Sequence, residues 1–250
     1  MPACCRFGEG YDEPFHFGYV QHLWSERSLP VQRRTRLSEE VWQSLTLAPA
    51  SYIVKRNLPM VASFDDYFRL PSQERTARRE RLEHLDPRLA AVPFGAPNYE
   101  ALQAPLAYAI LAPFHELWKH APLPARVLRL RLVCALASVL ATALLTLRLA
   151  ERFSLDRASQ YAAVFALLST QMFYASTAHI TNNWLVLPLW VLLLTAAIDS
   201  WKEPGRGRDP ARSDPGRGSG PRPISWLPSH WCSELSRCIA HARSFLSATR

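Results

Sequence analysis

Long stretches without a charged residue occupy the second half of the chain. They cover residues 132–147, 158–178 and 180–198. Because a helix rises about 1.5 Å per residue, about 20 apolar residues cross the hydrocarbon core of a bilayer. The first stretch reaches this length when 127–131 is added, in which case Arg129 and Arg131 extend toward the headgroups. The pattern predicts a transmembrane region of three helices within 126–200.

The alternative is that these stretches are the buried helices of a soluble all-α protein. Buried helices seldom lack a charged residue over three successive windows of this length. The sequence therefore favours an all-α polytopic membrane protein, with a long and mostly helical extracytoplasmic loop before the spans.

Positive charge between the predicted spans indicates their orientation. Loop 148–157 carries three arginines, and 202–208 carries a lysine and two arginines, so both fit the cytoplasmic side. This places 1–125 outside the membrane, although arginines at the outer end of the first span weaken the charge argument. Residues 1–10 lack the pattern of a signal peptide. We therefore expect a further span upstream that translocates the outer region.

The start of the outer region predicts a helix. Pro14 suits the first helical turn, and Phe15, Tyr19 and Leu23 recur every four residues. This spacing predicts a short amphipathic helix over 14–26. The Leu-Pro pair that follows is expected to end it.

Farther along the outer region the pattern is less regular. Interleaved acids and bases predict a solvated helix over 73–85, whereas 31–72 is expected to be a loop with at most one short helix. Residues 101–124 are apolar but contain four prolines, and therefore fit the membrane interface better than a crossing. The residues expected at headgroup depth are Tyr108, Trp118 and Lys119.

Composition changes at the end of the third predicted span. Residues 201–250 are rich in Gly, Pro, Arg and Ser and cannot bury a core. They are either a disordered basic tail on anionic lipid or the product of a reading-frame change, and the abruptness favours the second. The net charge of +8 lies largely in this tail and in 73–88. No nucleic-acid-binding motif accompanies it, so we expect no nucleic-acid partner. The five cysteines lack the spacing of a metal site, and no metal ligands are predicted.

Motifs that carry polar chemistry are distributed around the apolar stretches. They are YDEPFHFGYVQHL at 11–23, YEALQAPLAY at 99–108 and STAHITNNWLVLPL at 176–189. An acidic pair with a nearby histidine, a Q-x-P-L-x-Y element before a span and an N-N-x-L element opening a later span resemble the GT-C superfamily of integral membrane glycosyltransferases. The likeness is strongest to the bacterial branch related to protein mannosyltransferases and lipid A aminoarabinose transferases. It covers residues 11–200.

The resemblance implies transfer of a sugar from a polyprenyl-phosphate donor to a hydroxyl of a lipid or protein acceptor, at the outer face of the bacterial inner membrane. Asp12 is then the general base, with Glu13 as the substitute candidate, because a carboxylate that takes the proton activates a hydroxyl. His16 lies about one helical turn away and is placed to orient either acid. Acids also favour a helix N-terminus without any catalytic role.

A lipid-phosphate leaving group requires positive charge near its oxygens. Arg126 and Arg129 are the candidates in this sequence, and extension into the headgroups is their alternative role. No cofactor follows from the sequence, and a divalent metal ion stays an open candidate.

Amide side chains in the other two motifs are further candidates for substrate binding. Gln103 and Tyr108 either contact substrate or shape the loop before the span, and the second role is favoured. Asn182 and Asn183 either contact substrate or cap the third span, and capping is favoured.

Departures from the family pattern limit what the resemblance implies. The family has a span before the acidic pair, a double proline where this chain has Ala104 and Pro105, an aromatic residue at Ala107, and more than three spans. We therefore expect an amino-terminal fragment of such an enzyme. Two alternatives stay open: a non-catalytic membrane-bound fragment or binding protein, and a polymerase or ligase acting on lipid-linked glycans.

Overall fold

The fold is mostly helical in the computed structural model, which describes residues 12–202. In chain order the elements are α1 Glu13–Glu26, β1 Arg36–Ser38, α2 Glu39–Leu47, α3 Tyr52–Asn57, α4 Phe64–Arg69, α5 Ser72–Glu83, η1 Pro87–Ala91, β2 Pro93–Pro97, η2 Tyr99–Leu102, α6 Leu106–Trp118, α7 Leu123–Arg152, α8 Arg157–Leu168, α9 Gln171–Thr177, η3 Asn183–Leu185 and α10 Val186–Lys202. The described residues up to Ala196 belong to one compact unit. The expected tail at 201–250 lies almost entirely outside the described residues.

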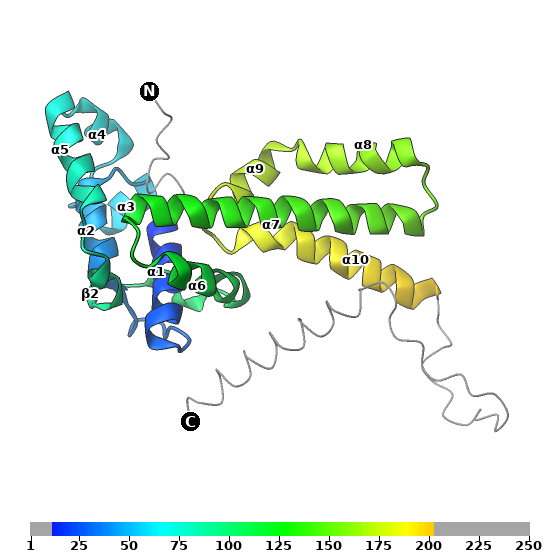
Figure 1. The fold of residues 1–250 in the computed structure, drawn as a ribbon, viewed down its shortest axis with the longest axis horizontal. Coiled ribbons are helices and arrows are strands. Elements are labelled where there is room, and N and C mark those ends of the chain that lie inside the picture. The colour runs from blue at the N-terminus through cyan, green and yellow to red at the C-terminus, as the bar shows by residue number, and fades with distance from the viewer. Residues whose placement is uncertain (1–11, 203–250) are drawn as a thin grey trace, which may run out of the picture. The chain divides into compact units, whose positions relative to one another are not determined.

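The predicted helix over 14–26 is confirmed as α1, and it is buried over most of its length. Pro14 occupies its first turn, and Arg27 ends it in the left-handed conformation with φ 51°. α1 packs against α6, as Figure 1 shows. The buried core joins α1, β1, α2, α6 and the beginning of α7. Outer-region residues and residues of the first predicted span therefore share one core.

The prediction of a loop over 31–72 is wrong, because this segment forms β1, α2, α3 and α4. β1 pairs with β2 in an antiparallel two-stranded sheet. Each of the three helices begins with a serine whose Oγ accepts a backbone N–H: Ser38 from Val41, Ser51 from Val54 and Ser63 from Asp66. Serine satisfies one of the free N–H groups of a first turn, so short helices form here despite their weak apolar pattern.

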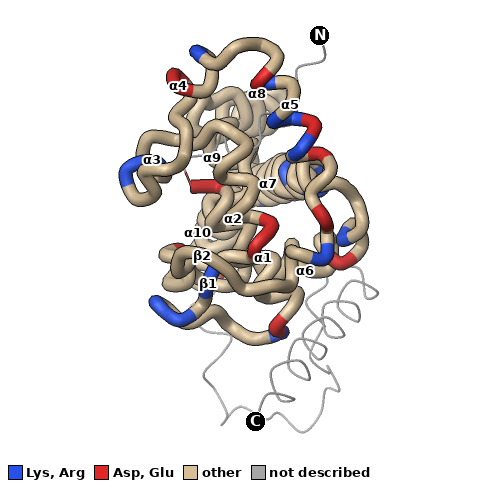
Figure 2. The backbone as a smooth tube through the Cα atoms, turned by 90° about the vertical axis from the view of Figure 1, so that its left-hand side faces the viewer, with Lys and Arg blue, Asp and Glu red and all other residues tan. Residues whose placement is uncertain are grey.

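The predicted charged helix over 73–85 is confirmed as α5, Ser72–Glu83. Lys, Arg, Asp and Glu colour much of α3, α4 and α5 in Figure 2. α4 has no buried residue, and α5 buries only Leu82. α4 and α5 are therefore largely solvated, and α5 packs against α2.

α7 has an exposed row of leucines and, after Leu130, a buried row of small and polar residues. Its exposed leucines recur every four residues: Leu128, Leu132, Leu136, Leu140 and Leu144. The buried row with the same spacing is Cys134, Ser138, Thr142 and Thr146. A helix of a soluble protein shows the reverse arrangement, whereas small and polar residues at helix contacts with apolar residues outside are typical of membrane helices.

Within residues 12–202, two helical segments are long and apolar enough to cross a membrane, Leu123–Arg152 and Asn183–Trp201. Only 33% and 17% of their most apolar windows are buried inside the protein. Both segments are therefore candidate membrane spans by length, composition and exposure.

The middle predicted span is not one helix. α8 ends at Leu168 and α9 begins at Gln171, and Oγ1 of Thr170 accepts the N–H of Phe173 at 3.3 Å. This cap starts a new helix and interrupts the run. Both helices pack against α7 and lead the chain back along it, as Figure 1 shows. The expectation of three continuous spans is therefore corrected to two long helical segments and a broken return.

Candidate functional site

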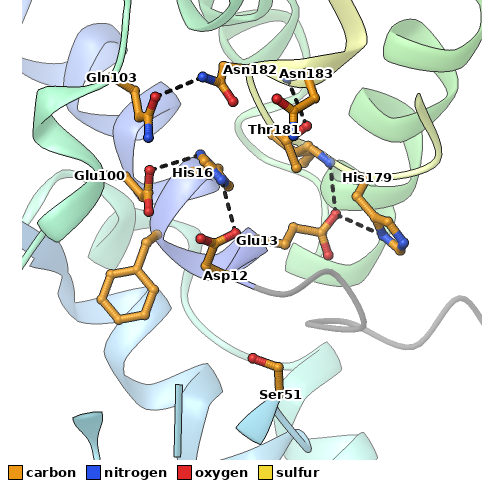
Figure 3. A network of polar contacts seen from close by, with 12 residues as sticks. Asp12, Glu13, His16, Ser51, Glu100, Gln103, His179, Thr181, Asn182 and Asn183 are labelled. Carbon is orange, nitrogen blue, oxygen red and sulfur yellow. Dashed lines mark hydrogen bonds and ion pairs between the residues drawn. The ribbon is translucent and has the colours of Figure 1, made fainter. Parts of the chain in front are cut away.

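Three potential proton-transfer or metal-binding side chains meet at the beginning of α1. Nε2 of His16 lies 3.0 Å from Oδ1 of Asp12, and its Nδ1 lies 3.8 Å from Oε2 of Glu100. Figure 3 shows the three side chains pointing toward one another: His16 lies in α1, Asp12 directly precedes it and Glu100 lies in η2. We call Asp12, His16 and Glu100 the acid–histidine cluster.

The residues that precede α1 and η2 explain how the cluster forms. Asp12 precedes α1 and makes no side-chain cap, so its carboxylate is free to meet His16 one turn later. Asn98 is buried, accepts the N–H of Glu100 at 3.0 Å and donates its Nδ2 to the carbonyl of Phe15 at 2.9 Å. This amide fixes η2 against α1 and directs Glu100 to the cluster.

Tyr108 supports His16 from the inner side of α6. Its hydroxyl lies 2.7 Å from Nδ1 of His16, and the side chain is fully buried. The ring stacks on Tyr19 with centroids 4.1 Å apart. When Nε2–H donates to Asp12, Nδ1 accepts from the hydroxyl of Tyr108. Tyr108 is therefore part of the protein interior and is not an exposed residue of an interfacial belt.

The two carboxyl groups of the cluster have different acidities. Burial alone would raise the pKa of Asp12, but hydrogen bonding and charge from His16 outweigh it and lower the pKa. Burial raises the pKa of Glu100, and the nearby charge of Asp12 adds to this shift although His16 opposes it. Asp12 is thus the group that accepts a proton, and Glu100 the one that holds a proton more readily.

Access to the cluster is through Asp12. Its side chain is 25% exposed, whereas those of His16 and Glu100 are 5% and 7% exposed. Oε2 of Glu100 is buried without a hydrogen-bond partner among the described residues. A ligand that enters beside Asp12 would reach this oxygen.

The cluster also presents a possible donor set for a metal ion. One ligand atom from each of its three residues lies within 4.8 Å of the others. One imidazole nitrogen and two carboxylate oxygens suit Zn²⁺ or Mn²⁺, and the unpartnered oxygen of Glu100 fits such a ligand role. The sequence predicted no metal ligands because Glu100 lies far along the chain from Asp12 and has no characteristic spacing to it.

Glu13, the substitute candidate for the base, has a different role. Oε1 accepts from Nε of Arg131 at 2.7 Å and from the N–H of Ile180 at 3.0 Å. Oε2 pairs with Nη2 of Arg131, and the side chain is 1% exposed. Glu13 therefore joins α1 to α7 and to the segment before η3, and its carboxylate is not available to a substrate.

The two arginines expected to bind phosphate together have separate partners. Arg126 is fully buried, pairs with Glu40, donates Nε to the carbonyl of Ala121 at 2.9 Å and lies 3.3 Å from Nε2 of His115. Arg129 is exposed, and its guanidinium lies 5.7 Å from the ring centroid of Trp118. Arg126 is thus a structural cation, and of the two only Arg129 is accessible.

The amide candidates meet beside the cluster. Nδ2 of Asn182 donates to Oε1 of Gln103 at 2.8 Å, next to His16 and Glu100 in Figure 3. Asn182 makes no side-chain cap, so the expectation that it caps the third span is wrong. Asn183 is exposed, and its N–H bonds Oγ1 of Thr181 at 3.1 Å. The Gln103–Asn182 bond holds the segment before α10 against the loop before α6.

The structure brings together Asp12, His16, Gln103, Tyr108 and Asn182, and it adds Glu100 and Asn98, which the sequence did not indicate. Comparison with protein-family models, with curated proteins and with solved structures finds no match. The functional argument therefore rests on the chemistry of the described residues.

Proposed function

We propose that this chain, or the enzyme of which it is a part, is an integral membrane glycosyltransferase that transfers a sugar from a polyprenyl-phosphate donor to an acceptor hydroxyl at the outer face of the membrane. The observation that carries the proposal is the partly exposed carboxylate of Asp12, held by buried His16 at the start of a buried helix. The resemblance of the three sequence motifs to the GT-C superfamily supports it.

The membrane part of the proposal is supported by α7. Its leucine row faces away from the protein, and its hydroxyl-bearing row faces the helix contacts. Exposed leucines over this length would be unfavourable in water, by about 25 cal/mol for each Å² of apolar surface. The bacterial inner membrane, as the specific location, follows only from the motif resemblance.

Asp12 has the properties that a general base requires. Its lowered pKa keeps the carboxylate ionised near neutral pH, and its side chain is 25% exposed. The acceptor hydroxyl transfers its proton to Asp12 while its oxygen bonds to the anomeric carbon of the sugar. The bond from that carbon to the phosphate oxygen breaks, and its electron pair leaves with the phosphate.

The neighbouring groups position the base and the leaving group. His16 orients Asp12, and Tyr108 fixes the imidazole by a hydrogen bond at 2.7 Å. Arg129, whose guanidinium lies over Trp118 at the other end of α6 from Tyr108, is the accessible one of the two arginines proposed for the phosphate. A divalent cation held by the acid–histidine cluster would supply additional charge there.

Asp12→Asn tests the proposal, since the amide keeps the shape of the side chain and cannot accept the proton. Membranes that contain wild-type protein or the variant are incubated with labelled polyprenyl-phosphate mannose or polyprenyl-phosphate aminoarabinose. We expect Asp12→Asn to lower transfer by about 10²–10⁴-fold. Asp65→Asn, at an exposed position on α4, is the matched control and should leave transfer unchanged.

Two outcomes would redirect the interpretation. Equal transfer by wild type and Asp12→Asn would remove Asp12 from the reaction. If wild type binds polyprenyl phosphate but transfers neither sugar, the non-catalytic binding protein becomes the better description.

A further inference from the structure

α6 has an exposed face that is largely apolar, and Glu116 is the exposed charged residue on this helix. The apolar residues on this face are Leu106, Ala109, Ile110, Pro113, Phe114 and Leu117. Their spacing of three and four residues places them along one side of the helix. The exposed fraction reaches 52% for Leu106 and 71% for Leu117.

The opposite face of α6 is already used by the core. Ala107, Tyr108, Leu111 and His115 are buried against the rest of the protein. A helix between a protein core and water normally carries polar residues on its outer side. α6 instead presents apolar residues on both sides, so its outer face is suited to apolar surroundings.

We propose that α6 lies in the membrane interface, with the face from Leu106 to Leu117 inserted at the boundary between headgroups and acyl chains. This inference rests on the proposed membrane location of the chain. In the chain, the apolar face is followed after a short connection by the exposed leucine row of α7, which begins at Leu128. One lipid-facing surface would then continue from α6 onto α7.

The junction between α6 and α7 has the composition of a headgroup-level belt. The guanidinium of Arg129 lies over the ring of Trp118, and Nζ of Lys119 lies 2.6 Å from Glu116 at the end of α6. Aromatic rings and cations are favoured at this depth, where the cations meet anionic lipid headgroups. Lys119 is paired with Glu116, so Arg129 supplies the positive charge that complements anionic headgroups and favours lipid over a protein partner as the occupant of the apolar face.

The location of α6 would fix the depth of the acid–histidine cluster. Tyr108 on its inner face bonds His16, while Ile110 and Phe114 lie on its outer face. Insertion of the outer face would therefore hold Asp12 close to the headgroup layer. A substrate group attached to a membrane lipid could meet the base there without leaving the bilayer.

Site-specific depth measurement tests the proposal on the full chain. The environment-sensitive fluorophore NBD is attached to Phe114→Cys, Glu116→Cys or Leu140→Cys in a background without other cysteines. The protein is reconstituted into phosphatidylethanolamine and phosphatidylglycerol vesicles that contain nitroxide-labelled lipid. We expect lipid quenching at Phe114→Cys to be roughly twofold stronger than at Glu116→Cys, and iodide quenching to show the opposite order.

The Leu140→Cys probe on α7 distinguishes failure of the proposed membrane location of the chain from failure of the proposed interfacial location of α6. If lipid does not quench this probe, the membrane location itself fails. If lipid quenches it but iodide reaches Phe114→Cys as readily as Glu116→Cys, α6 is in water and the inference is overturned. Protection of Phe114→Cys from both quenchers would show a protein partner on this face and would also overturn it.

Discussion

At the residue scale, the two adjacent acids Asp12 and Glu13 at the start of α1 have different roles, although they are neighbours in sequence. Asp12 precedes the helix and turns toward His16 at the protein edge. Glu13 is the first helical residue and points toward α7 and Arg131. Successive helical residues are separated by about 100°, so two neighbouring carboxylates need not share a site. Their different surroundings separate the catalytic candidate from the structural one.

Glu13→Gln is expected to destabilise the fold by about 3–5 kcal/mol, because it removes one charge from a buried, hydrogen-bonded ion pair with Arg131. The change in free energy of unfolding in detergent checks this value. Glu116→Gln is the control, since Glu116 pairs with Lys119 at the surface and its loss should change stability by about 0–1 kcal/mol. Similar small effects from both variants would argue against the buried Glu13–Arg131 pair.

His115 is expected to make stability depend on pH. Burial and the charge of Arg126 lower its pKa from 6.5 to about 3, so the folded protein holds it neutral while the unfolded chain protonates it below about pH 6.5. Its contribution is therefore full above that pH and is lost as the pH falls toward 3. Between pH 7 and pH 5 the loss is about 2 kcal/mol.

The variant His115→Gln isolates this titration, because glutamine can still accept a hydrogen bond from Arg126 but does not titrate. Stability of both proteins is measured from pH 7 to pH 5, and the difference between the two profiles is compared. A difference that is independent of pH would contradict a neutral, buried His115.

At the element scale, the helices with an apolar period were predictable and the helices that depend on capping were not. The four-residue spacing in α1 and the charge pattern of α5 are visible in the sequence. α2, α3 and α4 depend on Ser38, Ser51 and Ser63, whose caps compensate for short length. Thr170 likewise caps α9, so the middle apolar stretch, which hydropathy predicted as one span, forms two helices. The distribution of apolar residues thus predicted where helices occur better than it predicted where they begin and end.

Gly95 controls the contact between β2 and α2. Its φ of +64° is in the left-handed region, and a Cβ atom would collide with the ring of Trp42. We expect Gly95→Ala to destabilise the protein by about 1–3 kcal/mol, from backbone strain and displacement of the ring. Gly18→Ala is the comparison, because a Cβ there meets only side-chain atoms at longer distances, Cδ2 of Leu37 at 3.0 Å and Nδ2 of Asn98 at 3.5 Å. Thermal unfolding of both variants checks the order, and a larger loss for Gly18→Ala would contradict it.

At the scale of the whole molecule, the sequence predicted the long apolar helices but did not predict that Glu100 lies beside Asp12 and His16. Asp12 and His16 are one turn apart and could be connected by helical spacing. Glu100 lies on another element, and only the amide of Asn98 between η2 and α1 places it there. Contacts of this kind have no periodic signal in a single sequence. The assignment of Arg126 failed for the same reason, because its partner Glu40 is distant in the chain.

The central claim is that a lipid-linked phosphate reaches the acid–histidine cluster from the membrane, and photo-crosslinking tests it most directly. Reconstituted protein is irradiated with a benzophenone-bearing polyprenyl phosphate, and the labelled peptides are identified by mass spectrometry. The account predicts labelling of α1, α6 and the first turns of α7, and its suppression by unlabelled polyprenyl phosphate. Labelling confined to α8 and α10, or labelling that the competitor does not reduce, would contradict it.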